Sequence, residues 1–281
     1  LIEAFGAGAV GFLAGTLLPQ TLAQPTPAGK LDLGKISKLD ALLNAPLCTS
    51  TIAYVEDSGK AVAVDAETKE IVAGPSADHY EVLQAAFDRR GRVFLSGAFS
   101  AEGLVVKSNT MIVGLNMYLT RIRAVSGAQP ILIIDADLSY SESVRIEELM
   151  LHGNGLTVDG LYLKNASRSC SFWRLYIYNC KGRGVYIESG WIARFRDCWI
   201  TYNGTGIEVN TSGGSIEIDG CLVRFNDLHG MHVKAGGVRV YNTSFEFNGS
   251  WGIYVEGGKV ETHGGHTENN TDGGVYFGAG T

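Results

Sequence analysis

Six side chains suited to carbohydrate recognition recur at almost constant intervals in the second half of this 281-residue chain. A tyrosine ring can stack on the apolar face of a sugar, and a carboxylate or an imidazole can exchange hydrogen bonds or protons with its hydroxyl groups. If these side chains share one outward face, the sequence predicts a glycan-contacting stripe. The competing interpretation is that tyrosine simply favours exposed strand positions. The six residues are Tyr162, Tyr186, Glu208, His232, Tyr254 and Tyr276.

Each of them is the third letter of a repeated four-residue phrase: GLYL, GVYI, GIEV, GMHV, GIYV and GVYF. The leading glycines, from Gly160 to Gly274, lie 22 or 24 residues apart. The second and fourth positions are always apolar, which is typical of a strand with one buried face. A unit this short cannot bury its own apolar face and must stack on its neighbours. The pattern predicts an all-β fold, a single-stranded parallel β-helix with three strands in each coil of about 22 to 24 residues.

Stacking the coils turns equivalent positions into columns with a spacing of about 4.8 Å. One column is an asparagine ladder, predicted to be structural because a corner asparagine tolerates left-handed backbone and can hydrogen-bond to its copy in the next coil. Its members are Asn179, Asn203, Asn226, Asn248 and Asn270. An aromatic column is predicted to stack inside the core beneath it, with Tyr178, Tyr202, Phe225 and Phe247. An outward column of alternating charge is predicted to fix the register, with Arg194, Glu217, Arg239 and Glu261.

The chain divides into four segments. Residues 1–23 are predicted to form a hydrophobic anchor helix, because residues 4–23 contain no charged side chain and are long enough to contact a membrane. A signal peptide and an anchor buried in a capsid are the alternatives. Residues 24–50 are predicted to be a linker, and residues 1–50 together a contact with other subunits of a virion or surface assembly. Residues 51–115 are predicted to form the N-terminal module of the β-helix with a short capping helix, and residues 116–281 the remaining coils.

The bulk composition excludes one class of partner and predicts no cofactor. A net charge of −6 and a pI near 5.5 argue against a nucleic-acid surface, which needs a basic stripe. The five cysteines show no zinc or redox spacing. Cys198 and Cys221 occupy equivalent positions in adjacent coils, where they are predicted to be buried thiols, with a disulfide between coils as the alternative.

The segment from Ala53 to Leu115 resembles the N-terminal module of the pectate-lyase-like right-handed β-helix superfamily. In that family a strand pair leads to a helix of the form D-x-x-x-(I/V)-(I/L)-Q-A-A-(I/F), here Asp78 to Phe87, and then to two strands, here Val93 to Phe99 and Leu104 to Gly114. The resemblance implies a right-handed β-helix and says little about function. The module is also similar to those of archaeal surface proteins and viral spikes.

The enzymatic signatures of the resembled family are incomplete in this chain. Polygalacturonases combine clustered aspartates with G-H-G and R-I-K phrases, whereas Asp219 stands alone and no R-I-K occurs. Pectate lyases need several acidic calcium ligands beside a catalytic arginine. Asp135 and Asp137 have same-face spacing and are the candidates for a cation site, but the aligned coils supply no further ligand. No catalytic residue is predicted.

Six N-x-S/T sequons favour an extracellular location and are candidate glycosylation sites. They begin at Asn165, Asn203, Asn210, Asn242, Asn248 and Asn269. The prediction is therefore a non-enzymatic spike or adhesin on a virion or cell surface that binds host or environmental glycans. A polysaccharide lyase or glycoside hydrolase of the same fold and a structural subunit of an extracellular filament are the alternatives. Because no polar cap follows Phe277, further coils or a docked subunit are expected beyond it.

Overall fold

The computed structural model describes residues 50–136, 143–166 and 169–278, which lie within the compact unit Cys48–Thr281. The predicted anchor helix over residues 1–23 lies outside the described residues, as does the predicted linker except for Ser50. Across the part that is described, no helix is long and apolar enough to span a membrane.

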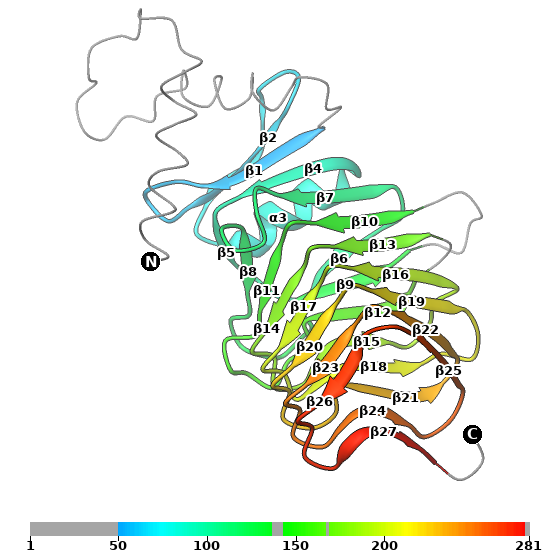
Figure 1. Ribbon diagram of the computed structural model, residues 1–281. Coiled ribbons are helices and arrows are strands. Elements are labelled where there is room, and N and C mark those ends of the chain that lie inside the picture. Colours follow the sequence, from blue (N-terminus) through cyan, green and yellow to red (C-terminus); the bar gives the residue numbers. More distant parts are fainter. Residues whose placement is uncertain (1–49, 137–142, 167–168, 279–281) are drawn as a thin grey trace, which may run out of the picture. The chain divides into compact units, whose positions relative to one another are not determined.

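The chain passes through three sheets in turn and contributes one strand to each sheet per coil, so each sheet pairs strands from successive coils (Figure 1). Sheet A contains β1 (Thr51–Val55), β2 (Ala61–Asp65), β3 (Ile71–Ser76), β4 (Gly91–Ser96), β7 (Thr110–Gly114), β10 (Val144–Glu147), β13 (Cys170–Trp173), β16 (Ile192–Arg196), β19 (Ser215–Asp219), β22 (Gly237–Tyr241) and β25 (Lys259–His263). Sheet B contains β5 (Ala98–Ser100), β8 (Arg121–Arg123), β11 (Met150–His152), β14 (Tyr176–Tyr178), β17 (Trp199–Thr201), β20 (Leu222–Arg224), β23 (Ser244–Glu246) and β26 (His266–Glu268). Sheet C contains β6 (Leu104–Val106), β9 (Leu132–Asp135), β12 (Leu161–Asn165), β15 (Arg183–Ile187), β18 (Thr205–Asn210), β21 (Met231–Ala235), β24 (Trp251–Val255) and β27 (Gly273–Phe277). The predicted all-β fold with three strands per coil is confirmed.

The predicted capping helix is confirmed as α3 (His79–Asp88), which follows an antiparallel pairing of β1, β2 and β3. Asp78 caps its first turn by accepting hydrogen bonds from the backbone N–H groups of Tyr80 and Glu81. The helix buries Val82, Leu83, Ala86 and Phe87 and packs against the β1–β3 strands and against β5 and β6 of the first coil. From β4 onward the strands of successive coils pair in parallel.

In the coils from β13 onward, the corner after each sheet A strand and the corner after each sheet B strand are turned by a residue in the left-handed region of φ. After sheet B the turning residues are Asn179, Tyr202, Phe225, Phe247 and Asn269, with φ between 52° and 59°. The side chain of such a corner residue points outward and not into the core.

The predicted core position of the aromatic column is therefore wrong. Tyr202 is 45% exposed and Phe247 is 42% exposed. Their rings and that of Phe225 stack on the outside of the corner, with centroids 5.1 and 5.2 Å apart. Tyr178 does not belong to this column, because it pairs with Thr201 inside sheet B, one residue before the corner.

The asparagine ladder is present, but it begins one coil later than predicted. Asn203, Asn226 and Asn248 are buried, and each donates its side-chain amide to the carbonyl oxygen of the next, at 3.1, 2.9 and 2.8 Å, ending on Asn270. Asn179 is a corner residue, and Cys180 occupies the ladder position, its backbone N–H donating to Asn203 Oδ1 at 3.0 Å. The ladder residues themselves follow the left-handed residue and do not adopt that conformation.

The repeated glycine is explained by its contact with this ladder. A Cβ at Gly206 would lie 2.4 Å from the carbonyl oxygen of Gly230 and 2.9 Å from Nδ2 of Asn226. Gly230 has the same surroundings in the next coil, with the Gly252 carbonyl oxygen and Asn248 Nδ2. Neither glycine needs a positive φ. The phrase therefore begins with glycine because the next coil passes too close for any side chain.

The described cysteines are buried free thiols, as predicted, and the alternative disulfide between Cys198 and Cys221 is not formed. Burial raises the pKa of the Cys180 thiol to about 12, with a smaller contribution from the nearby Asp159. Such thiols are inert packing groups.

Candidate functional site

The six predicted stripe residues lie in one continuous column on the outer face of sheet C. The strand register pairs each with the next, from Tyr162 with Tyr186 to Tyr254 with Tyr276, without interruption. The sequence placed all six correctly because they share one position in the repeated phrase.

The two ends of this stripe are stacks of rings. Tyr162 and Tyr186 stack with centroids 5.3 Å apart and planes 13° apart, and Tyr254 and Tyr276 stack at 5.1 Å and 5°. His229, which precedes the fourth phrase, stacks on Tyr254 at 4.7 Å. Rings that stack along the column cover much of one another's faces. Sugars approaching the stripe would therefore meet ring edges and polar tips more than open aromatic faces.

The centre of the stripe is an ion-pair network around Glu208, whose side chain is only 11% exposed. Arg183 Nη1 lies 3.0 Å from one of its oxygens, and Lys234 Nζ lies 3.1 Å from the other. Arg183 also holds Asp159 through Nε and Nη2 at 3.0 and 2.6 Å, and its guanidinium lies 3.5 Å from the ring centroid of Tyr186. Both oxygens of the Glu208 carboxylate are therefore paired with a cationic side chain.

The protonation behaviour of this network follows from its partners. Burial alone would lower the pKa of Arg183, but the carboxylates of Asp159 and Glu208 outweigh it and raise the pKa. Burial raises the pKa of Tyr162, and its hydrogen bond to the Glu188 carboxylate raises it further. At neutral pH, Arg183 is a fixed cation and Tyr162 a neutral phenol. The site is thereby suited to hold and orient a polar ligand.

Two histidines border the network. His232 Nε2 lies 2.9 Å from a Glu256 oxygen, and Nδ1 lies 3.9 Å from Glu208. The rings of His229 and His232 are 5.3 Å apart. Burial lowers the pKa of His229, and the neighbouring His232 lowers it further. His229, Arg183, Asp159 and Lys234 were not predicted as site residues, because each contacts the stripe from outside its column.

A second surface, which we call the sheet A groove, lies across the outer faces of β10, β13, β16 and β19 and has a volume of about 740 Å³. It is formed by the charge column and by a parallel column two residues further along each strand, in which Glu147, Trp173, Arg196 and Asp219 pair in register. The charge column itself is in the predicted register from Arg194 to Glu261. From the sequence, that column was predicted to have only a structural role, and the groove was not predicted.

Trp173 provides the aromatic surface of the groove. The residue is 38% exposed, and its indole N–H donates to Asp197 Oδ2 at 3.0 Å, which orients the ring. Three arginines surround it, each paired with a groove carboxylate: Arg145 with Glu147, Arg194 with Glu217 at 3.5 Å, and Arg196 with Asp219 at 3.4 Å. The groove thus combines one oriented ring with alternating hydrogen-bond donors and acceptors.

The candidate cation site and two of the sequons have other roles. Asp135 accepts hydrogen bonds from Asn165 and Lys164 and also lies 3.6 Å from Lys107 Nζ; Asp137 lies outside the described residues. Asn203 and Asn248 were predicted as glycosylation candidates, but their amides are buried in the ladder and cannot carry glycans in the folded chain. Asn210, Asn242 and Asn269 are exposed, and Asn165 is half-buried.

The sheets, corners and asparagine ladder define the protein as a parallel β-helix. Residues 136–281, more than half of the chain, match the family model for the right-handed β-helix region. The chain therefore belongs to the right-handed β-helix family, which confirms the predicted handedness and the resemblance to the pectate-lyase-like superfamily.

The chain is also similar to solved structures, among them an epimerase module and a phage protein. The A-module of the mannuronan C-5 epimerase AlgE4 from Azotobacter vinelandii is 18% identical, with a TM-score of 0.44 over 70% of this chain and 75% of its own. ORF18 of Geobacillus virus E2 is 14% identical, with a TM-score of 0.46 over 92% of this chain and 66% of its own. A search of curated protein sequences finds no match.

Proposed function

We propose that this β-helix is a non-enzymatic attachment protein of a virion or cell surface and that it binds a glycan in the sheet A groove. The observation that carries the proposal is the arrangement around Trp173, an indole whose orientation is fixed before any ligand arrives. A pre-oriented aromatic surface lowers the entropy cost of binding, and a sugar ring can stack on it while its hydroxyl groups reach the flanking side chains.

The partners of the groove carboxylates support binding over catalysis. A glycosidase needs two carboxyl groups that are available to the substrate as acid and base or nucleophile. In the groove, Glu147, Glu217 and Asp219 are paired with arginines, and Asp197 accepts the indole N–H. Arginine–carboxylate pairs offer fixed donors and acceptors to hydroxyl groups, so we propose a polyhydroxylated, uncharged stretch of glycan as the ligand.

Binding to a panel of immobilised glycans tests the proposal. The wild-type chain should bind at least one glycan, and Trp173→Ala should lose that binding by tenfold or more, because stacking on the ring is removed. Trp191→Ala is the matched control, since it removes another exposed indole outside the groove and should leave binding unchanged.

The stripe on sheet C is the alternative glycan surface, and Tyr254→Ala tests it in the same assay. A loss of binding in Tyr254→Ala together with full binding in Trp173→Ala would move the site from sheet A to sheet C. Release of soluble products from the bound polysaccharide by the wild-type chain would contradict the non-enzymatic part of the proposal and favour a lyase or hydrolase.

A further inference from the structure

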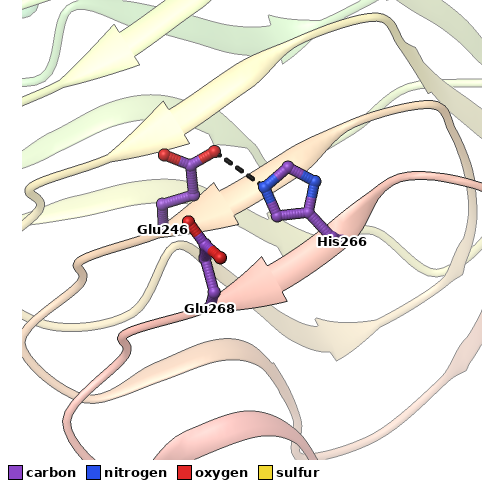
Figure 2. A group of neighbouring side chains, drawn as sticks. All are labelled: Glu246, His266 and Glu268. Atoms are coloured by element: carbon purple, nitrogen blue, oxygen red, sulfur yellow. Dashed lines mark hydrogen bonds and ion pairs between the residues drawn. The ribbon is translucent and has the colours of Figure 1, made fainter.

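A cluster of three metal-ligand side chains lies on sheet B, away from both surfaces described above. Figure 2 shows the carboxylates of Glu246 on β23 and Glu268 on β26 converging with the imidazole of His266 on β26. One ligand atom of each residue lies within 4.8 Å of the others. His266 and Glu268 are two residues apart on one strand and share its outward face, and Glu246 is the direct register partner of Glu268 in the preceding coil.

The two carboxylates form an unfavourable pair in the absence of a cation. Like charges directly opposite on neighbouring strands destabilise the sheet, and the side chain of Glu246 is only 13% exposed. Arg224 is the register partner of Glu246 on its other side, but its guanidinium lies over the rings of Phe225 and Trp199, at 5.2 and 5.9 Å from their centroids. Within the described residues, the only ion pair of Glu246 is with His266, and Glu268 has none.

The imidazole is already oriented toward the carboxylates. His266 Nε2 lies 2.9 Å from Glu246 Oε1, while Nδ1 lies 3.3 Å from Ser244 Oγ, the hydroxyl of its register partner. Histidines that bind metals are held in this way, with the second ring nitrogen fixed by a hydrogen bond. With Nδ1–H donating to Ser244 Oγ, Nε2 is the ring nitrogen that can bind a metal ion.

We propose that Glu246, His266 and Glu268 bind one Zn²⁺ ion and join two adjacent coils of sheet B. One imidazole nitrogen and two carboxylate oxygens are a ligand set that zinc accepts, and three protein ligands leave a fourth position for water. With zinc–ligand distances of about 2.0 to 2.2 Å, tetrahedral ligand atoms lie roughly 3.4 Å apart. The ligand atoms must therefore close by little more than about 1 Å, which the exposed side chain of Glu268 can supply.

Calorimetric titration of the full chain with Zn²⁺ after treatment with a chelator tests the site. We expect one tight equivalent, weakened by about tenfold or more in His266→Ala and in Glu268→Gln. His263→Ala is the matched control, because this histidine stacks on Tyr241 on sheet A and removing it leaves the three ligands intact. Ca²⁺ should bind more weakly than Zn²⁺, because calcium takes oxygen ligands and gains little from an imidazole.

Glu268→Gln changes an exposed side chain to one of equal size, so this variant keeps the test valid if His266→Ala fails to fold. Zn²⁺ should also raise the unfolding temperature of the wild-type chain and of His263→Ala, and should raise that of Glu268→Gln by clearly less at the same zinc concentration. Equal zinc affinity in the wild type and Glu268→Gln, or no tight equivalent in the wild type, would overturn the proposal and leave the cluster as a histidine–glutamate ion pair. Glycan binding in the sheet A groove is independent of either result.

Discussion

The buried asparagine ladder and the outer stripe of sheet C repeat with the same coil spacing but are built on opposite principles. The ladder position holds asparagine in four successive coils, from Asn203 to Asn270, and the amides of Asn203, Asn226 and Asn248 bond to both neighbouring coils. The stripe holds tyrosine, glutamate and histidine at one equivalent position. Regular spacing therefore identifies a column of equivalent residues. Whether the residue type in that column is uniform or varied indicates whether the column is structural or can take part in binding.

The physical cause of the difference is the access of water. A buried polar group whose partner is removed loses its hydrogen bond and gains no solvent in exchange, at about 1 to 3 kcal/mol for each group. An exposed side chain on a strand is solvated when its partner is lost, so the same change costs a few tenths of a kcal/mol to about 1 kcal/mol.

Asn226→Ala is expected to give the largest loss of stability. The Asn226 side-chain oxygen accepts hydrogen bonds from the backbone N–H and the side-chain amide of Asn203, and its amide nitrogen donates to the Ile200 carbonyl oxygen. The substitution removes all three of these buried hydrogen bonds. The free energy of unfolding should fall by about 3 kcal/mol in urea titrations. Asn210→Ala, at an exposed position, is the control and should change it by less than about 0.5 kcal/mol. Similar losses in both variants would contradict a special role for the ladder.

Gly206→Ala should be the next most damaging change. The added methyl group would meet the Gly230 carbonyl oxygen at 2.4 Å and Val223 Cγ1 at 2.7 Å, so the coils must move apart at a cost of about 1 to 3 kcal/mol. At Gly213 the same substitution meets nothing within 4 Å and needs no positive φ, so Gly213→Ala should be neutral or slightly stabilising. Thermal unfolding of the two variants provides the measurement. Equal destabilisation would show that the glycine of the phrase is not set by the contact between coils.

The sequence predicted the fold and the register of the outer columns because each of these rests on one position repeated many times. The six stripe residues and the charge column were all placed correctly. The ladder was misplaced by one residue at Asn179, because the corner after sheet B reads asparagine and cysteine in that coil, whereas in the next three coils it reads an aromatic residue and asparagine. The spacing could have revealed the error, because Asn179 lies 24 residues before Asn203, whereas the following steps in the ladder are 23 and 22 residues.

The site chemistry could not be predicted in the same way. The network around Glu208 is built from three different coils, which contribute Asp159, Arg183 and Lys234. Contacts between side chains of different columns do not produce a periodic pattern in the sequence. The sheet A groove was missed for a similar reason, since Trp173 stands among charged residues in the part of its column that lines the groove. A hollow between side chains depends on how they are oriented, which a pattern of residue types does not record.

Glu102 lies near the surface, but its carboxylate accepts several hydrogen bonds, as the buried ladder amides do. Its contribution to stability should therefore depend on pH. Burial alone would raise its pKa, but the hydroxyl of Ser126 and the backbone N–H groups of Ser126, Gly127 and Ala128 donate to it and lower the pKa from 4.5 to about 2. Because the folded-state pKa is below the ordinary one, the stabilisation is complete above about pH 4.5 and disappears as the pH falls toward 2. Glu102→Gln should cost about 1.5 kcal/mol at pH 7 and much less near pH 2. Urea titrations at several pH values measure this, and a loss that is independent of pH would contradict the assignment.

The charge column of sheet A should show the smallest effect, because its members are exposed or partly exposed to solvent. Glu217→Arg places three arginines in successive coils and replaces two favourable neighbours with unfavourable ones, which should cost about 1 kcal/mol. Arg239→Glu should cost a similar amount. The double reversal restores an opposite pair between the two positions, so it should cost about as much as one single change and not the sum of both. Salt should shrink all three differences, since exposed charges are screened. Additive losses in this double-mutant cycle would mean that the facing side chains do not interact, despite their register.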